Sequence, residues 1–187
     1  MDENPQSHPD VVDILTADHL DMLALVRQIK TTPDAEQRRD LADTVIAEVV
    51  RHSVAEEMFV YPVMAKHLPG GTDELEHDKE EHAELIAMMK RMEDADASAP
   101  HFMELVGEFE QLLDHHAKDE EDEQFPKLRQ NIPRQDLIDL GQKVDAAKRA
   151  APTRPHPNAP RSELFHKTVG PGMGMVDRLR DRLTGRE

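Results

Sequence analysis

One phrase occurs twice in this chain and constrains its fold more than any other feature. The copies are His52-x-x-x-Glu56-Glu57-x-x-x-Tyr61-Pro62 and His116-x-x-x-Glu120-Glu121-x-x-x-Phe125-Pro126. In a helix, residues four apart lie one above the other on the same face. Each copy therefore predicts a helix that aims an imidazole and a carboxylate at one point. Two such helices would supply ligands for a dinuclear metal site.

The composition favours packed helices around an aliphatic, methionine-containing core. Aromatic residues make up only 3% of the 187 residues, and strands favour aromatic and β-branched side chains. A chain of this length is expected to form a single domain. We therefore predict an all-α protein.

Capping and breaking signals divide the chain into helices. Asp34 and Thr72 are plausible N-caps, Pro100 suits a first helical turn, and Pro62 should kink or end its helix. The expected helices cover about 11–30, 35–66, 73–94 and 100–130, with a shorter one following Pro133 to about 149. Short connections between the first four predict an up-down-up-down four-helix bundle with a short extra helix.

The chain is expected to have three parts. Residues 1–10 are predicted to be disordered, and residues 11–150 form the bundle with its extra helix. Residues 151–187 are rich in proline and glycine, which predicts an extended tail ending in a short amphipathic helix.

Each of the four long helices places one histidine at the centre of its apolar face. At about 100° per residue, Glu56 lies about 40° from His52, and Glu120 takes the same place in the second copy. Burying these carboxylates is costly unless something pairs with them. The inward histidines are His19, His52, His82 and His116.

A metal explains this inward set more simply than a hydrogen-bonded histidine–glutamate network, which is the alternative. Imidazole and carboxylate are ligands for iron, manganese and zinc. Zinc usually takes four ligands, whereas six or more nitrogen and oxygen ligands suggest two octahedral ions. We expect two iron ions, joined by an oxo or carboxylate bridge, with manganese as the second choice.

These residues resemble the hemerythrin-like, or HHE cation-binding, family over about residues 11–130. The segments that carry the resemblance are Asp18-His19-Leu20, the two repeated phrases and Glu81-His82. The tail resembles those of actinobacterial members, through Arg154-Pro155-His156-Pro157 and Gly170-Pro171-Gly172. The resemblance implies a four-helix bundle around a non-haem di-iron centre. Its implied ligands are His19, His52, Glu56, His82, His116 and Glu120.

The third helix departs from the family pattern. Oxygen-carrying hemerythrins have His-x-x-x-His there, whereas Asp78 stands four residues before His82 in this chain. His77, which a local distortion near the helix start would bring inward, is the first candidate for a further ligand. Glu81 ranks second and Asp78 third, and each could equally be a solvated charge. Fewer histidines and more carboxylates favour redox chemistry over simple oxygen carriage.

Other polar residues near the repeated phrases have simpler expected roles. Glu57 and Glu121 point about 100° away from the inward carboxylates and should be solvated. His115 should lie at the surface, and Tyr61 is expected to pack rather than to reach the site. Glu123 is expected either to accept a hydrogen bond from a ligand imidazole or to lie in solvent.

Charge and hydropathy exclude several classes of partner. The net charge is −16 and the acidic excess lies within residues 1–150, which disfavours nucleic acid. No stretch reaches 18 apolar residues, so no membrane span is expected. The polar N-terminus is unlike a secretory signal, and the absence of cysteine is compatible with a cytoplasmic protein.

The inward histidine and glutamate set predicts a non-haem di-iron protein that reacts with O2, H2O2 or NO. Some mycobacterial members of the family are associated with peroxide breakdown, so the enzymatic form we expect is catalase-like. The alternatives are a sensor that signals to a protein partner through the tail, and iron buffering. Ferritin-like sites need two Glu-x-x-His pairs, and the chain has only Glu74–His77, which excludes them.

Overall fold

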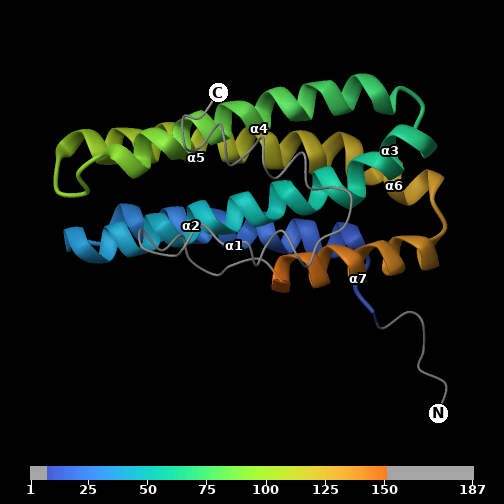
Figure 1. Ribbon diagram of the computed structural model, residues 1–187, viewed down its shortest axis with the longest axis horizontal. Coiled ribbons are helices and arrows are strands. Elements are labelled where there is room, and N and C mark those ends of the chain that lie inside the picture. Colours follow the sequence, from blue (N-terminus) through green and yellow to red (C-terminus); the bar gives the residue numbers. More distant parts are fainter. Residues whose placement is uncertain (1–7, 151–187) are drawn as a thin grey trace, which may run out of the picture.

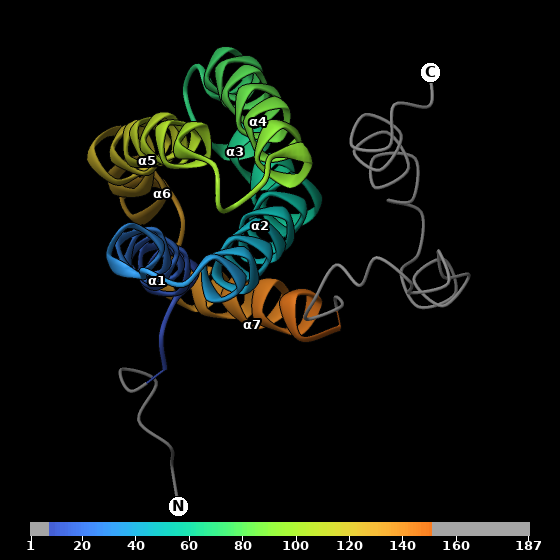
Figure 2. The same ribbon diagram turned by 90° about the vertical axis from the view of Figure 1, so that its left-hand side faces the viewer.

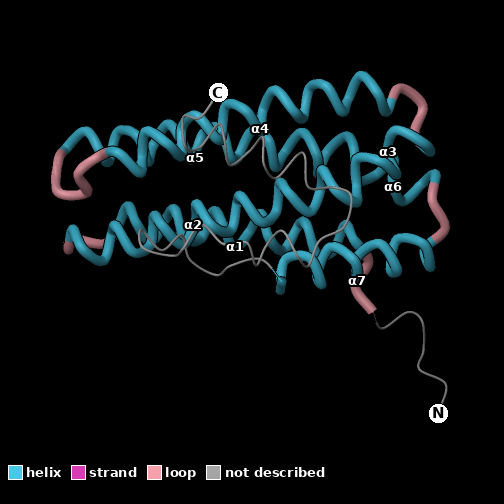
Figure 3. The backbone as a smooth tube through the Cα atoms, in the orientation of Figure 1, coloured by secondary structure: helices cyan, strands magenta, loops and turns pink. Residues whose placement is uncertain are grey.

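The computed structural model describes residues 8–150, and these contain helices and short connections without strands (Figure 3). The predicted tail and its terminal amphipathic helix lie outside the described residues, as do residues 1–7. Within the described part, no helix is both long and apolar enough to cross a membrane.

Four long helices form the bundle, and Figure 2 shows them end-on at its corners. They run lengthwise in Figure 1 and are joined by short loops, as the up-down-up-down prediction requires. Their bounds are α1 (Val11–Thr31), α2 (Ala35–Ala55), α4 (Gly71–Asp94) and α5 (Pro100–Asp119).

A fifth helix, α7 (Arg134–Ala150), lies outside the bundle against α1 and α2 (Figure 2). The close approach of α7 to the start of α1 requires a small residue at the point of contact. A Cβ atom at Gly141 would lie 3.0 Å from the backbone nitrogen of Val11, so glycine lets α7 pack against the start of α1.

Side-chain caps fix where the helices begin. Asp10 and Asp13 form a reciprocal capping box at α1, and Asp34 caps α2 as predicted. Asp10, assigned to the disordered segment from sequence, is buried and accepts hydrogen bonds from Arg129 at 3.0 and 3.2 Å. The third bundle helix begins at Gly71, after Gly70 at φ 77°, so Thr72 lies within its first turn.

Both repeated phrases pass through a π-helical turn. The helix of α2 continues through η2 (Glu56–Val60) into α3 (Tyr61–His67), and that of α5 through η3 (Glu120–Gln124) into α6 (Phe125–Asn131). Pro62 and Pro126 therefore interrupt the α-helical pattern without ending the helix. A proline has no N–H and its ring clashes with the carbonyl four residues earlier, and a wider turn removes both conflicts.

The apolar core is split into two blocks along the bundle axis. On α1, Leu15 belongs to one block and Met22 to the other, and His19 lies between them. On α5, Leu113 packs in one block, whereas Phe125, at the start of α6, packs in the other. The inward histidines thus occupy a polar layer between two apolar blocks.

Candidate metal centre

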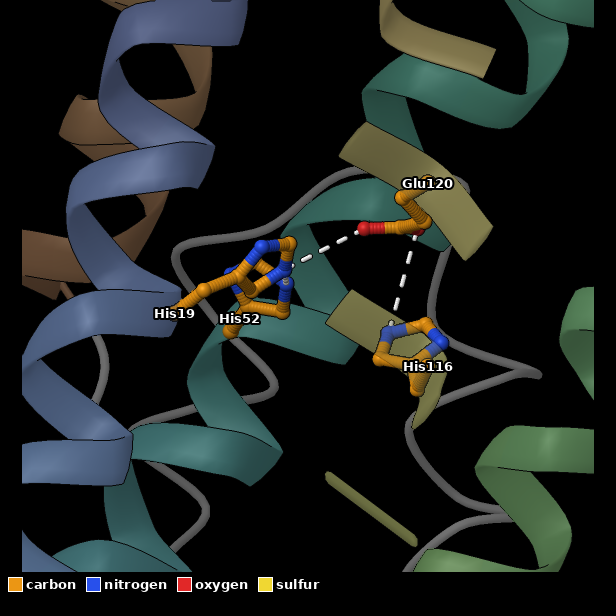
Figure 4. Close-up of side chains that lie close together, drawn as sticks. All are labelled: His19, His52, His116 and Glu120. Atoms are coloured by element: carbon orange, nitrogen blue, oxygen red, sulfur yellow. Dashed lines mark hydrogen bonds and ion pairs between the residues drawn. The ribbon is translucent and has the colours of Figure 1, made fainter. Parts of the chain in front are cut away.

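The structure gathers all six residues that the resemblance implies as ligands into this layer. Each has at most 2% of its surface exposed. Figure 4 shows three of the imidazoles directed toward one another, with Glu120 between His19 and His116. The six are His19 from α1, His52 from α2, Glu56 from η2, His82 from α4, His116 from α5 and Glu120 from η3.

The four imidazoles form two pairs. The ring centroids of His19 and His52 are 4.8 Å apart, and those of His82 and His116 are 4.9 Å apart. Centroid distances between the pairs are longer, at 6.0 and 6.4 Å. The Nε2 atoms of His19 and His52 are only 3.1 Å apart. Two nitrogens that face each other so closely suit a shared cation.

Each inward carboxylate spans the two pairs. Oε1 of Glu56 lies 3.0 Å from Nε2 of His52, and Oε2 lies 3.4 Å from Nε2 of His82. Glu120 repeats this arrangement, with Oε2 at 3.2 Å from Nε2 of His19 and Oε1 at 3.8 Å from Nε2 of His116. Each carboxylate therefore offers one oxygen to each histidine pair.

A second set of carboxylates holds the outer nitrogen of every inward histidine. Each Nδ1 atom lies 2.8–3.5 Å from a carboxylate oxygen. The pairs are His19 with Glu121, His52 with Asp18, His82 with Glu57, and His116 with Glu81. An Nδ1–H that donates outward leaves the Nε2 lone pair facing inward, as metal sites require.

This outer set corrects the expectation that Glu57 and Glu121 are solvated. Glu57 is buried and Glu121 is about half-buried, and each accepts from a histidine of another helix. The expectation assumed 100° per residue, but both glutamates lie in π-helical turns, which turn less per residue. The second glutamate of each phrase therefore points closer to the first than an α-helix would allow.

In order of burial, the three candidate ligands on α4 run opposite to their predicted ranking. Asp78 is fully buried, and its Oδ1 accepts a hydrogen bond of 2.6 Å from Nε2 of Gln124. Glu81 is largely buried but supports His116 from outside. His77 is 55% exposed and is not brought to the buried cluster. α4 is regular around His77, so no distortion turns this side chain inward.

Tyr61 lies closer to the cluster than predicted. Its hydroxyl is 3.3 Å from Nδ1 and 3.4 Å from Nε2 of His82, and the two rings stack. His115 lies at the surface as expected, and Glu123 is exposed.

Asp18 and Gln124 are contacts that the sequence reasoning missed. Asp18 precedes an inward histidine, and its proximity to His52 depends on how α1 and α2 pack. Gln124 closes the second π-helical turn. Asp18 belongs to a segment that carries the family resemblance, but nothing local in the sequence identifies His52 as its partner or Asp78 as the partner of Gln124.

Buried carboxylates favour the protonated form of two of the inward imidazoles, those of His52 and His82, in the metal-free protein. Burial opposes a charged ring, but Glu56 and Asp18 outweigh it and raise the pKa of His52 to about 10. Burial likewise opposes charge on His82, and Glu56 and Glu57 raise its pKa to about 9. Burial raises the pKa of Asp78 to about 7.

Several buried polar atoms of this cluster make no hydrogen bond, although other polar atoms lie nearby. Among the described residues they include both carboxylate oxygens of Glu56, Nε2 of His116 and Oδ2 of Asp78. Unsatisfied buried atoms of this kind are costly, and they converge here from several helices. Imidazole nitrogens and carboxylate oxygens that face inward without partners fit a metal cation.

Comparison with known families agrees with this geometry. The sequence model of the hemerythrin HHE cation-binding domain matches residues 10–128. The chain belongs to this family. The matched segment contains every residue of the buried cluster.

The chain is also similar to two known relatives and to one solved structure. A hemerythrin-like protein of Schizosaccharomyces pombe is 26% identical over 174 residues, which cover 92% of this chain and 86% of that protein. A DNA nickase of Nostoc is 24% identical over 139 residues, which cover 74% of this chain but only 39% of that protein. A hemerythrin HHE cation-binding domain-containing protein of Mycobacterium kansasii has the same fold, with a TM-score of 0.67 and 24% identity. The likeness covers 75% of this chain and 86% of that one.

Proposed function

We propose that this protein is a non-haem di-iron protein that reacts with oxygen-derived or nitrogen-oxide ligands. The observation that carries the proposal is the spanning position of Glu56 and Glu120 between the two histidine pairs. A carboxylate with one oxygen near each pair suits two neighbouring cations better than one. Each cation would then receive two imidazoles and two carboxylate oxygens.

The donor set favours iron. The buried donors are nitrogen and oxygen atoms without thiolate, and the chain contains no cysteine. Iron commonly takes six ligands. At the pair formed by His82 and His116, Asp78 would offer a donor in addition to the two imidazoles and two carboxylate oxygens. Manganese, which accepts the same donors, is the second choice.

The surroundings of the two pairs differ. Asp78 stands one turn before His82, whereas the fully buried Leu15 stands one turn before His19. The ring of Phe125 stacks on His19 at 5.9 Å. The His19 and His52 pair therefore has an apolar side, formed by Leu15 and Phe125. We place the binding of a small ligand such as O2, H2O2 or NO on that side.

The protein's own groups would prepare this site for redox chemistry. Bound iron would supply electron transfer to and from the small ligand. The outer carboxylates hold the imidazole protons at Nδ1, and burial excludes bulk water. The Tyr61 hydroxyl, next to His82, is the nearest phenolic proton donor. Catalase-like breakdown of peroxide is the enzymatic form that we favour.

Metal content and peroxide turnover of the aerobically purified protein test this proposal. We expect about two irons per chain, one at each histidine pair, because nitrogen and oxygen donors of this type bind iron. We also expect a near-ultraviolet charge-transfer absorption and peroxide loss well above the uncatalysed rate. His52→Ala and His116→Ala should lose both iron and activity.

His101→Ala is the matched control, because His101 is an exposed histidine that pairs with Glu104 and lies outside the buried cluster. It should retain iron and activity. Less than one metal per folded chain would overturn the di-iron proposal. Full iron content with peroxide loss at the uncatalysed rate would exclude the catalase-like form and would favour ligand binding or sensing.

A further inference from the structure

A second cluster of potential ligands lies at the surface between α4 and α5. It borders a cavity of about 190 Å³. The residues that line this cavity are His77, Glu80, Glu81, Glu84, Leu112 and His115. Three of them are glutamates, so the hollow is strongly acidic and is open to solvent beside His77 and His115.

Two exposed histidines and two carboxylates alternate around this cluster. Nε2 of His77 lies 3.6 Å from Oε1 of Glu81 and 3.5 Å from Oδ2 of Asp119. His115 faces the same two carboxylates, with Nε2 at 3.7 Å from Glu81 Oε1 and Nδ1 at 3.6 Å from Asp119 Oδ1. Each histidine thus contacts both carboxylates, at distances longer than good hydrogen bonds.

These separations suit donors that surround a cation. Metal–ligand bonds of about 2.0–2.2 Å in tetrahedral geometry place neighbouring donor atoms about 3.3–3.6 Å apart. The donor atoms of His77, Glu81 and Asp119 lie within 4.8 Å of one another. The imidazole of His77 and the two carboxylates form a donor set for divalent zinc, cobalt, iron or manganese, and His115 lies beside it with one ring nitrogen near each carboxylate.

Glu81 connects this surface cluster to the buried one. Its Oε2 accepts from Nδ1 of His116 at 2.9 Å, which supports an inward imidazole. Its Oε1 is buried, makes no hydrogen bond and faces the two exposed histidines. One carboxylate therefore serves both clusters, with one oxygen turned to each.

We propose that His77, Glu81 and Asp119, with His115 beside them, bind a divalent transition-metal cation at the surface and pass it to the buried centre. The binding part is independent of the proposed function, and the uptake part rests on it. The cation would be attracted by the acidic hollow and held by the exposed imidazoles. Movement of the Glu81 side chain then opens the way past His116.

Binding is tested with Co²⁺, whose visible absorption reports its ligands. The full-length protein, carrying whatever metal it retains on purification, is titrated with CoCl2. We expect one further Co²⁺ per chain in the wild type. In a His77→Ala/His115→Ala variant the affinity should fall by at least the roughly 10- to 100-fold that follows the loss of an outer partner at a metal site. His101→Ala, the matched control, should bind as the wild type does.

Uptake is tested by the rate at which metal-free protein acquires chelator-resistant Fe²⁺ under anaerobic conditions. The double variant should load several-fold more slowly than the wild type and His101→Ala, and should reach the same final iron content. Equal Co²⁺ binding in the double variant and the wild type would overturn the surface site. Weakened Co²⁺ binding with an unchanged loading rate would overturn the uptake role. A wild type that never acquires chelator-resistant iron would overturn the di-iron proposal instead, and with it the uptake role, but not the surface site.

Discussion

Individual carboxylates outside the buried centre set the orientation of its imidazoles, and Asp18 offers a direct test. It accepts from Nδ1 of His52 at 3.2 Å. Asp18→Asn keeps the size of the side chain but removes its charge, so the imidazole loses its anionic acceptor. Loss of such outer partners typically lowers metal affinity by about 10- to 100-fold. Competition with a chelator of known affinity measures the change.

Asp21→Asn is the matched control for this prediction. Asp21 lies on the same helix but is exposed and is not part of the cluster. Its variant should hold metal as the wild type does. If Asp18→Asn retained wild-type affinity, the outer carboxylates would be structural partners of the histidines rather than determinants of metal binding.

Helical phase was enough to predict the inward direction of the four histidines and of Glu56 and Glu120. It failed for Glu57 because a constant 100° per residue does not describe a π-helical turn. On α4 the sequence offered three neighbouring candidates with no local means of ranking them. Only the packing of Gln124 against Asp78 distinguishes the buried carboxylate from its neighbours.

At the scale of the helix, the π-helical turns are expected to be necessary for the metal site. Deletion of Met58, within η2, should restore regular α-helical hydrogen bonding, because such a turn equals one extra residue in an α-helix. Glu57 would then rotate away from His82. We expect a folded, fully helical protein with a lowered metal content. Circular dichroism and metal analysis of the same preparation measure both properties.

Met58→Ala is the appropriate control, since it removes the side chain without changing the number of residues in the turn. It should keep its metal. A deletion variant that binds as much metal as Met58→Ala would show that the wider turn is dispensable.

Helix positions were predictable because their limits depend on local chemistry. Asp34 and Pro100 mark helix starts where the structure has them. The prolines of the repeated phrases were expected to kink or end their helices. The structure shows instead that the helices continue, because the change of helical pitch just before each proline accommodates its ring.

At the scale of the whole molecule, the metal-free protein should lose stability as pH rises. The folded-state pKa values of His82 and His52 are raised from 6.5 to about 9 and about 10. A group whose pKa is raised by folding makes its full contribution to the stability of the folded state when the pH is below its unfolded pKa. This contribution is lost as the pH rises through the folded-state pKa. The free energy of unfolding should therefore decline from about pH 6.5 to about pH 10.

Urea unfolding of the chelator-treated protein across this range measures the decline. His52→Gln should show a shallower dependence, because one of the two raised histidine pKa values is removed. The metal-loaded protein should be less sensitive, since bound cations take the place of the protons. A flat profile for the metal-free wild type would contradict the protonated, buried histidines.

The family and the bundle were predictable from the doubled phrase and the order of the histidines. The position of α7 was not, because it depends on a tertiary contact at Gly141 that has no signature in sequence. The same holds for Asp18, whose partner lies on another helix. Sequence periodicity shows which face of a helix is buried, but not which residue of a neighbouring helix it meets.

Leu15, which stands one turn before His19 as Asp78 stands one turn before His82, has a consequence for how the centre would fill. The donor frame is nearly two-fold symmetric, yet one half has a carboxylate where the other has Leu15. Two identical cations bound there would be inequivalent, one more firmly held than the other. Loading would then be sequential, and a half-filled intermediate would accumulate before the second position fills. The molecule would in this way distinguish a permanent cation from an exchangeable one while using a single repeated phrase.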